Sequence, residues 1–103
     1  MHISIESALN KLKDSSPFME LFSHGSLTIE IYKPNKIDFQ QPHEKDEVYV
    51  IVEGSGEFIN GDKKINFKKG DFLFVAAGIE HRFINFSDDF STWVIFYGPK
   101  GGE

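Results

Sequence analysis

The stretch QPHEKDEVYVIVEGSG, residues 41–56, places polar side chains directly before an apolar run. His43 and Glu47 precede Val48–Val52, which is apolar on both faces of an extended strand. A carboxylate that enters a protein core without a partner costs several kcal/mol or takes up a proton. These two side chains therefore either stay in water or are compensated by something inside the protein.

The composition is that of one soluble globular domain. The chain has 103 residues, of which 40% are hydrophobic and 26% are charged. Its net charge of −5 disfavours a nucleic-acid partner, because phosphates repel an acidic surface. The absence of cysteine excludes a disulfide framework and a thiolate metal site, so any metal would rest on histidine and carboxylate ligands.

The sequence carries no obvious targeting segment. It has no run of roughly 18 apolar residues that would span a membrane. Its N-terminus lacks the basic segment followed by an apolar one that marks a secretory signal. We therefore expect a cytoplasmic protein without a membrane partner.

A short helix is expected near the N-terminus. Ser4 is a suitable N-cap, and the residues after it repeat at helical spacing in the apolar set Ile5, Ala8, Leu9 and Leu12. The run Ser15-Ser16-Pro17 should end the helix. We expect residues 1–24 to hold this helix and a lead-in strand, and residues 25–103 to form a barrel, within one domain overall.

The rest of the chain alternates short strands with turns. Alternation and apolar runs predict strands over 27–31, 48–52, 72–75, 81–86 and 92–97. Asn60-Gly61 predicts a two-residue hairpin loop whose two central residues both have positive φ. Many short strands at close spacing favour an all-β antiparallel sandwich or barrel.

Three polar residues of the opening stretch share a parity. If the segment is extended, Gln41, His43 and Glu47 all point to one side of the strand. His81 begins a later strand. Two histidines and one glutamate on facing strands form a divalent-metal site with open positions for water or substrate. Such a site would compensate the Glu47 carboxylate.

Here the spacing resembles a known family. Glu47-x6-Gly54, preceded by His43, resembles the first cupin motif, G-x5-H-x-H-x(3,4)-E-x6-G. The second motif, G-x5-P-x-G-x2-H-x3-N, is similar to Gly70-x5-Ala76-x-Gly78-x2-His81-x3-Asn85. The resemblance covers roughly residues 25–97 and implies a cupin-type antiparallel jelly-roll barrel with a short N-terminal helix. It implies metal ligands at His43, Glu47 and His81, with Gln41 as either a fourth ligand or a solvated loop residue before Pro42.

Three positions depart from the cupin motifs. Asn35 replaces the first motif glycine and tolerates positive φ. Ala76 replaces the motif proline, which loosens a turn without removing chemistry. Gln41 replaces the first motif histidine; its amide oxygen can ligate a hard cation but is a weaker donor than imidazole.

Apolar side chains near the motifs predict a small substrate pocket above the metal. Tyr49, Phe83, Trp93 and Ile95 are the candidates, and ordinary core packing is the alternative for each. Arg82 has the opposite parity to His81, so no clear cation faces the pocket. This disfavours phosphosugar isomerase chemistry, since bound phosphate usually recruits arginine or lysine.

The resemblance implies an enzyme that acts on a small organic molecule, of a dioxygenase-like, isomerase-like or decarboxylase-like kind. The divalent metal would be Fe, Mn, Zn, Ni or Co. A non-catalytic barrel that binds a metal or small ligand is an open alternative, and so is a relic whose polar residues hydrogen-bond one another. Because 48–52 and 93–97 are apolar on both faces, we also expect a homodimer that covers the outer face.

Overall fold

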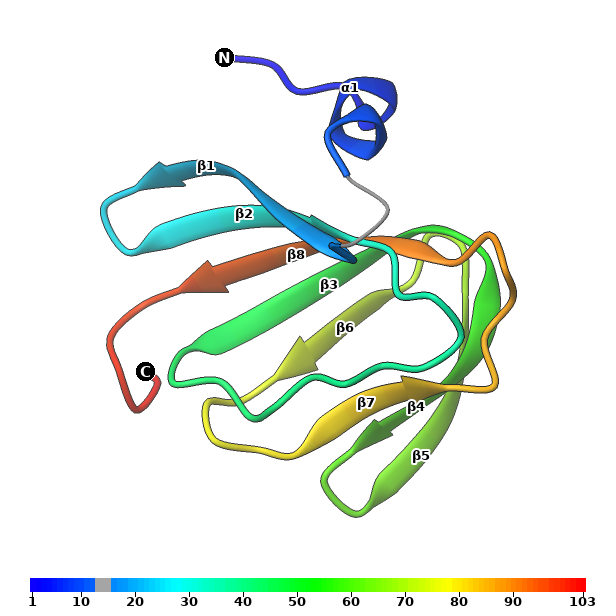
Figure 1. The fold of residues 1–103 in the computed structure, drawn as a ribbon. Helices are drawn as coiled ribbons and strands as arrows, with labels where there is room; N and C mark the ends of the chain where they lie inside the picture. The colour runs from blue at the N-terminus through cyan, green and yellow to red at the C-terminus, as the bar shows by residue number, and fades with distance from the viewer. Residues whose placement is uncertain (13–15) are drawn as a thin grey trace.

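The fold is two antiparallel sheets with one short helix. The computed structural model describes residues 1–12 and 16–103. Within them lie α1 (Ile5–Asn10), β1 (Phe18–His24), β2 (Leu27–Tyr32), β3 (Asp46–Glu53), β4 (Ser55–Asn60), β5 (Lys63–Lys68), β6 (Phe72–Val75), β7 (His81–Ile84) and β8 (Ser91–Tyr97). One sheet has the order β1-β2-β8-β3-β6, and the other has the order β5-β4-β7 (Figure 1). This confirms the predicted antiparallel all-β architecture with its N-terminal helix.

The N-terminal helix is capped as predicted. The backbone N–H of Ser7 donates to the Ser4 hydroxyl at 3.1 Å, which satisfies one of the free donors of the first turn. Ala8 is fully buried, and the helix lies on the side of β1 and β2 (Figure 1). The predicted stop at Ser15 lies outside the described residues. Within the described parts of the chain, no helix is long and apolar enough to cross a lipid bilayer.

Strand register decides which side chains face the inside of the barrel. In the pair β3–β8, Glu47 lies opposite Phe96 and Tyr49 lies opposite Val94. Directly opposed side chains in an antiparallel pair point to the same face. Tyr49 and Val94 are 0% and 2% exposed, so this face is the interior. Glu47 therefore enters the protein core from the end of β3.

The prediction that Trp93 and Ile95 line the interior is wrong. Trp93 lies opposite Val50, and Ile95 lies opposite Val48. These residues alternate with the buried ones, so they project from the outer face of the five-stranded sheet. Because β8 is apolar on both faces, its sequence does not distinguish the two sides.

The centre of the barrel is a cluster of aromatic rings. Tyr49, Phe58, Phe83 and Phe90 are each at most 1% exposed. Phe83 lies with its ring centroid 4.6 Å from those of Phe58 and Phe90 and 4.9 Å from that of Tyr49. Burial of each such ring contributes about 1.5–3 kcal/mol. Tyr49 and Phe83 point inward as expected, and they fill the core.

Two turns differ from the sequence expectation. The β4–β5 hairpin has Asn60 paired with Lys63, so its loop is Gly61-Asp62 rather than Asn60-Gly61. Among the described residues other than glycine, only Lys36 and Asn85 have positive φ. The hairpin loop therefore has one positive φ, at Gly61, and the left-handed residue near Asn35 is its neighbour Lys36. Asn85, with φ of 50°, ends β7 two residues earlier than predicted.

Candidate metal centre

The structure brings together the three predicted histidine and glutamate ligands. Glu47 is the second residue of β3, His81 is the first of β7, and His43 lies in the loop before β3. Each offers one ligand atom, and these atoms all lie within 4.8 Å of one another. The N–H of Gly78 donates to the His43 carbonyl at 2.8 Å, which ties the His43 loop to the turn before β7. The group therefore joins the two sheets at one end of the barrel.

The His81 ring is oriented as a metal ligand. Its Nδ1 lies 2.8 Å from the carbonyl oxygen of Ile79 and donates a proton to it. In a neutral imidazole, this leaves a lone pair on Nε2. That Nε2 lies 2.8 Å from Oε1 of Glu47, and Nε2 of His43 lies 3.7 Å from the same oxygen. A backbone acceptor that fixes the ligating tautomer is a usual feature of metal-bound histidine.

Three buried polar atoms of the site have no hydrogen-bond partner. They are both carboxylate oxygens of Glu47 and Nε2 of His81. Oε1 of Glu47 and Nε2 of His81 lie 2.8 Å apart, but with the ring proton on Nδ1 both atoms are acceptors, so the contact does not satisfy them. A buried ionised carboxylate without a partner costs several kcal/mol. A divalent cation would compensate all three atoms at once, so the donor set fits a metal.

Local electrostatics favours the neutral imidazole of His43, which is the form that can bind a metal. Burial lowers the pKa of the His43 imidazole, although the Glu47 carboxylate acts in the opposite direction. Burial also disfavours the charged form of His81, but the Glu47 carboxylate and the Ile79 carbonyl outweigh it and raise the pKa of His81. Without a cation, the Glu47 carboxylate thus favours the protonated form of His81. A metal ion would compete with a proton for Nε2 of His81.

The amide that reaches this site belongs to Gln40, not to Gln41. Oε1 of Gln40 accepts a hydrogen bond from the Tyr49 hydroxyl at 2.9 Å and lies 3.4 Å from Nε2 of His43. Gln41 is exposed. The structure thus does not place Gln41 as the fourth ligand. The parity argument was wrong because residues 33–45 form no strand, so their side chains do not alternate.

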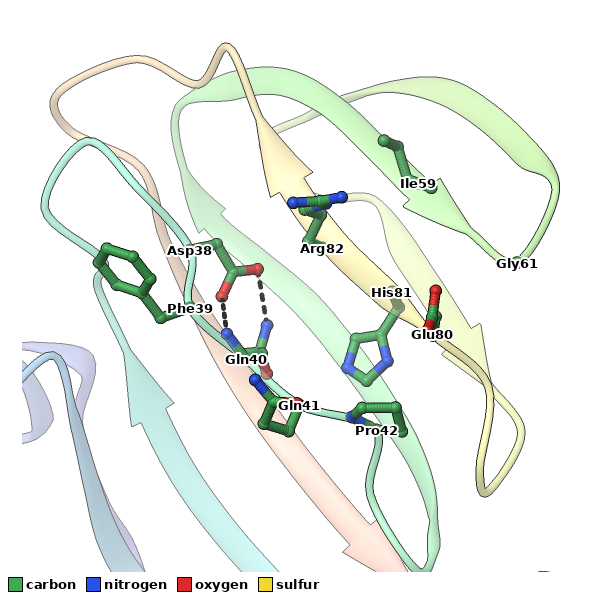
Figure 2. A pocket seen from close by; sticks show the side chains of 10 residues that line it. All are labelled: Asp38, Phe39, Gln40, Gln41, Pro42, Ile59, Gly61, Glu80, His81 and Arg82. Atoms are coloured by element: carbon green, nitrogen blue, oxygen red, sulfur yellow. Dashed lines mark hydrogen bonds between the residues drawn. The ribbon is translucent and has the colours of Figure 1, made fainter.

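Asp38 fixes the orientation of Gln40 and was not predicted. It is 5% exposed, and its carboxylate accepts hydrogen bonds from the side-chain amide of Gln40 at 2.9 Å and from its backbone N–H at 3.0 Å (Figure 2). Asp38 also accepts from the Tyr32 hydroxyl and from the N–H of Phe83 at 2.9 Å. With the amide nitrogen held by Asp38, the amide oxygen must face His43. An acidic residue between two apolar neighbours was the only sequence signal for this role.

Two cavities meet at Gln40. One, of about 300 Å³, is lined by Gln40 and His81 together with Asp38 and Arg82 (Figure 2). The other, of about 310 Å³, is lined by Gln40 and His43 together with residues of β2 and β8. Each candidate histidine ligand thus lines a different cavity. None of the four residues predicted to line a substrate pocket lines either of these two cavities.

Comparison with known proteins agrees with the geometry. An uncharacterised protein of Streptomyces coelicolor is 25% identical over 97 residues, which cover 92% of each chain. The crystal structure of a Neisseria meningitidis protein superposes with a TM-score of 0.77 at 19% identity, over 95% of this chain and 100% of that one. A cupin-2 domain protein of Shewanella frigidimarina gives a TM-score of 0.73 at 15% identity, over 93% and 94% of the two chains. These likenesses confirm the cupin fold.

The match to the cupin domain family (Cupin_2) covers residues 28–97, from β2 to the end of β8. Both sequence motifs and all three of the clustered ligands lie inside this range. The chain belongs to the cupin domain family.

Proposed function

We propose that this cupin is a divalent-metal protein that acts as an enzyme on a small organic molecule. The observation that carries the proposal is the set of three unpartnered buried atoms on Glu47 and His81. A protein gains nothing in stability from such a set unless something compensates it. Hydrogen bonding among the three residues, as in a metal-free relic, would leave fewer orphaned atoms.

Each residue of the site has a definite part in this proposal. His43, Glu47 and His81 would hold the metal, which could be Fe, Mn, Zn, Ni or Co by ligand type. When bound, such a metal polarises a carbonyl or enediol oxygen, or supports oxygen chemistry in the case of iron. Glu47 would set the charge of the centre, and Ile79 would keep His81 in its ligating tautomer. Gln40 would offer its amide oxygen to a substrate or water beside His43.

Reconstitution followed by a substrate screen tests the proposal. Metal-free protein would be loaded separately with Fe(II), Mn(II) and Zn(II) and incubated with a mixture of small carbonyl, hydroxyl and enol compounds. We expect metal-dependent loss of one compound class, detected by mass spectrometry, and oxygen uptake if iron is the active metal. The His81→Ala variant should lose both. Metal binding without any turnover would instead favour the non-catalytic binding barrel.

We further propose that the chain forms a homodimer through the outer face of the five-stranded sheet. Phe72 and Phe74 of β6 are 65% and 44% exposed, and they lie opposite Val50 and Val48. Together with Trp93 and Ile95, they make a continuous apolar surface across three strands.

Sedimentation velocity tests the dimer. We expect a dimer that Phe72→Lys dissociates, whereas Ile65→Lys on the other sheet should leave it intact. A monomeric wild type would refute the dimer.

The expected cytoplasmic location also remains a proposal, which cell fractionation would test.

A further inference from the structure

The cavity beside His43 has an apolar wall and a few polar groups. Phe18, Val94 and Phe96 contribute the apolar part, and Glu30, Gln40 and His43 contribute the polar part. His43 and Gln40 belong to the metal centre described above. Glu30 is the one acidic side chain among the residues that line this cavity. It was not singled out by the sequence, where it alternates with the apolar residues of its strand.

Strand register places Glu30 on the inner face of the sheet. Glu30 of β2 lies opposite Val94 of β8, which in turn lies opposite Tyr49 of β3. All three side chains therefore point to the same side. Two strand spacings separate the backbones of Glu30 and Tyr49, a distance of roughly 10 Å. Glu47 lies opposite Phe96, so it shares this face with Glu30.

The Glu30 carboxylate has no protein partner among the described residues, where it forms neither a hydrogen bond nor an ion pair. Burial raises its pKa, and the neighbouring carboxylates of Glu20 and Glu47 raise it further. The fold thus places a half-buried acid beside a cavity and gives it no protein donor among the described residues. A ligand in the cavity could supply that donor.

The charges around the cavity select against anions. No lysine or arginine is among the residues that line it. A second cavity, which shares Glu30, His43 and Phe96 with this one, is also lined by Glu20, Glu44 and Lys45. The Lys45 ammonium donates to the carbonyl of Ser26 at 3.0 Å. A divalent ion with Glu47 leaves one positive charge at the centre, which an ionised Glu30 offsets, and the buried Asp38 carboxylate lies beside Gln40 as a further acidic group. A further negative charge on the ligand would be uncompensated.

We propose that Glu30 is a ligand-recognition residue, and that the cavity takes a non-anionic small molecule whose amine or hydroxyl group donates to Glu30. The apolar part of that molecule packs against Phe18, Val94 and Phe96. This assignment rests on the proposed function in taking the cavity as the ligand site of the metal centre. It makes phosphorylated and carboxylated compounds poor ligands.

Three matched probes test the assignment: 2-phenylethylamine, 2-phenylethanol and phenylacetate share an aromatic ring and differ in charge. Their binding would be measured by NMR shifts of the backbone amides of Glu30, Val94 and Phe96, first in metal-free protein. We expect the amine to bind about tenfold more tightly than phenylacetate, with the alcohol between them. The Glu30→Gln variant should reduce this preference to less than about twofold. Glu53→Gln, which removes the same charge from the far end of β3, should retain it.

Other results of the same experiment would contradict the role proposed for Glu30. Phenylacetate binding as tightly as the amine, or an unchanged preference in Glu30→Gln, would overturn the role of Glu30. Absence of shifts with all three probes would also overturn it, since the cavity would then not accept such molecules. The metal-free measurement is independent of the metal centre. Failure of the protein to bind metal would therefore refute the proposed function, but it would not affect the test of Glu30.

Discussion

Nε2 of His81 lies 2.8 Å from Oε1 of Glu47, and neither atom has a hydrogen-bond partner although both are buried. The opposite ring nitrogen of His81 is committed to the carbonyl of Ile79. The pair therefore presents two electron-rich atoms to each other, an arrangement that a proton or a metal ion stabilises.

Replacing Glu47 with glutamine separates metal stabilisation from folding. In the wild type, Zn(II) at a hundred times its dissociation constant should add about 2.7 kcal/mol to the free energy of unfolding. For a domain of this size, that gain raises the melting temperature by roughly 10 °C or more. The Glu47→Gln variant should gain nothing from metal. Without metal at pH 8, it should be at least as stable as the wild type, because the glutamine amide can donate to His81. Calorimetry with and without Zn(II) measures both effects, and an equal metal-induced shift in the two proteins would contradict the ligand role.

Gln40 and its neighbour Gln41 form a matched pair of variants. Gln40→Ala leaves the Tyr49 hydroxyl without its acceptor and removes one of the two donors to Oδ2 of Asp38, so it should lower the free energy of unfolding by about 1–3 kcal/mol. It should also weaken metal binding, because Gln40 contacts His43. Gln41→Ala should change stability by less than about 0.5 kcal/mol. Chemical denaturation and metal titration of both variants check this, and a larger effect at Gln41 would show that the structure has assigned the wrong amide.

Glycine at position 54 is required by close packing as well as by backbone conformation. Its φ is +90°, and an added Cβ would lie 2.6 Å from the Cα of Phe90. Gly70 has the same φ, but a Cβ there would meet nothing within 4 Å. Gly70→Ala should therefore cost only the left-handed backbone term of about 1–2 kcal/mol. Gly54→Ala should cost about 1–3 kcal/mol more because of overpacking. Urea denaturation distinguishes the two, and equal losses would rule out the packing contribution.

Asn85, the last residue of the second cupin motif, combines positive φ with a hydrogen bond. Its side-chain amide donates to Glu57 at 2.7 Å. Asn85→Gly should lose only the hydrogen bond, whereas Asn85→Ala should also suffer the left-handed strain of about 1 kcal/mol or more. If the two variants have the same free energy of unfolding, the strain term is absent.

The same contact has a pH signature. The Asn85 hydrogen bond, and then the charge of Lys64, lower the pKa of Glu57. A carboxyl whose pKa is lower in the folded state stabilises the protein above its unfolded pKa, and that contribution is lost as the pH falls through the folded value. The wild type should thus lose this stabilisation below about pH 4.5. In Asn85→Gly, the pKa of Glu57 should rise, as NMR titration would show; an unchanged pKa would contradict the contact.

Much of the fold could be predicted from the sequence because its signals are local. The spacing after Ser4 predicted the helix, and alternation and turn residues predicted the strands. The three clustered candidate ligands could be predicted because two motifs with fixed spacing place them just before β3 and at the starts of β3 and β7. The Gly61 loop was predicted at the right place but with the wrong central residues, since hairpin register depends on the pairing of both strands.

The remaining errors have a common physical cause. Side-chain parity holds only within a strand, so it failed across the loop that carries Gln40 and Gln41. It also failed to choose a face for Trp93, because β8 is apolar on both sides. Glu30 was not predicted as a site residue, because an acidic residue that alternates with apolar residues along a strand normally faces solvent. In the folded chain, the Glu30 side chain lies on the face of β2 that borders a cavity. This follows from the pairing of β2 with β8, which the sequence does not give.

The metal content of the untagged protein, purified without chelators, tests the central claim most directly. Elemental analysis would be run on the wild type and on Glu47→Gln prepared in parallel, before and after incubation with Fe(II), Mn(II) and Zn(II). The account predicts about one transition-metal ion per wild-type chain and none above background in the variant. Absence of metal from both proteins after reconstitution would contradict it and leave a barrel whose buried glutamate and histidine serve no metal.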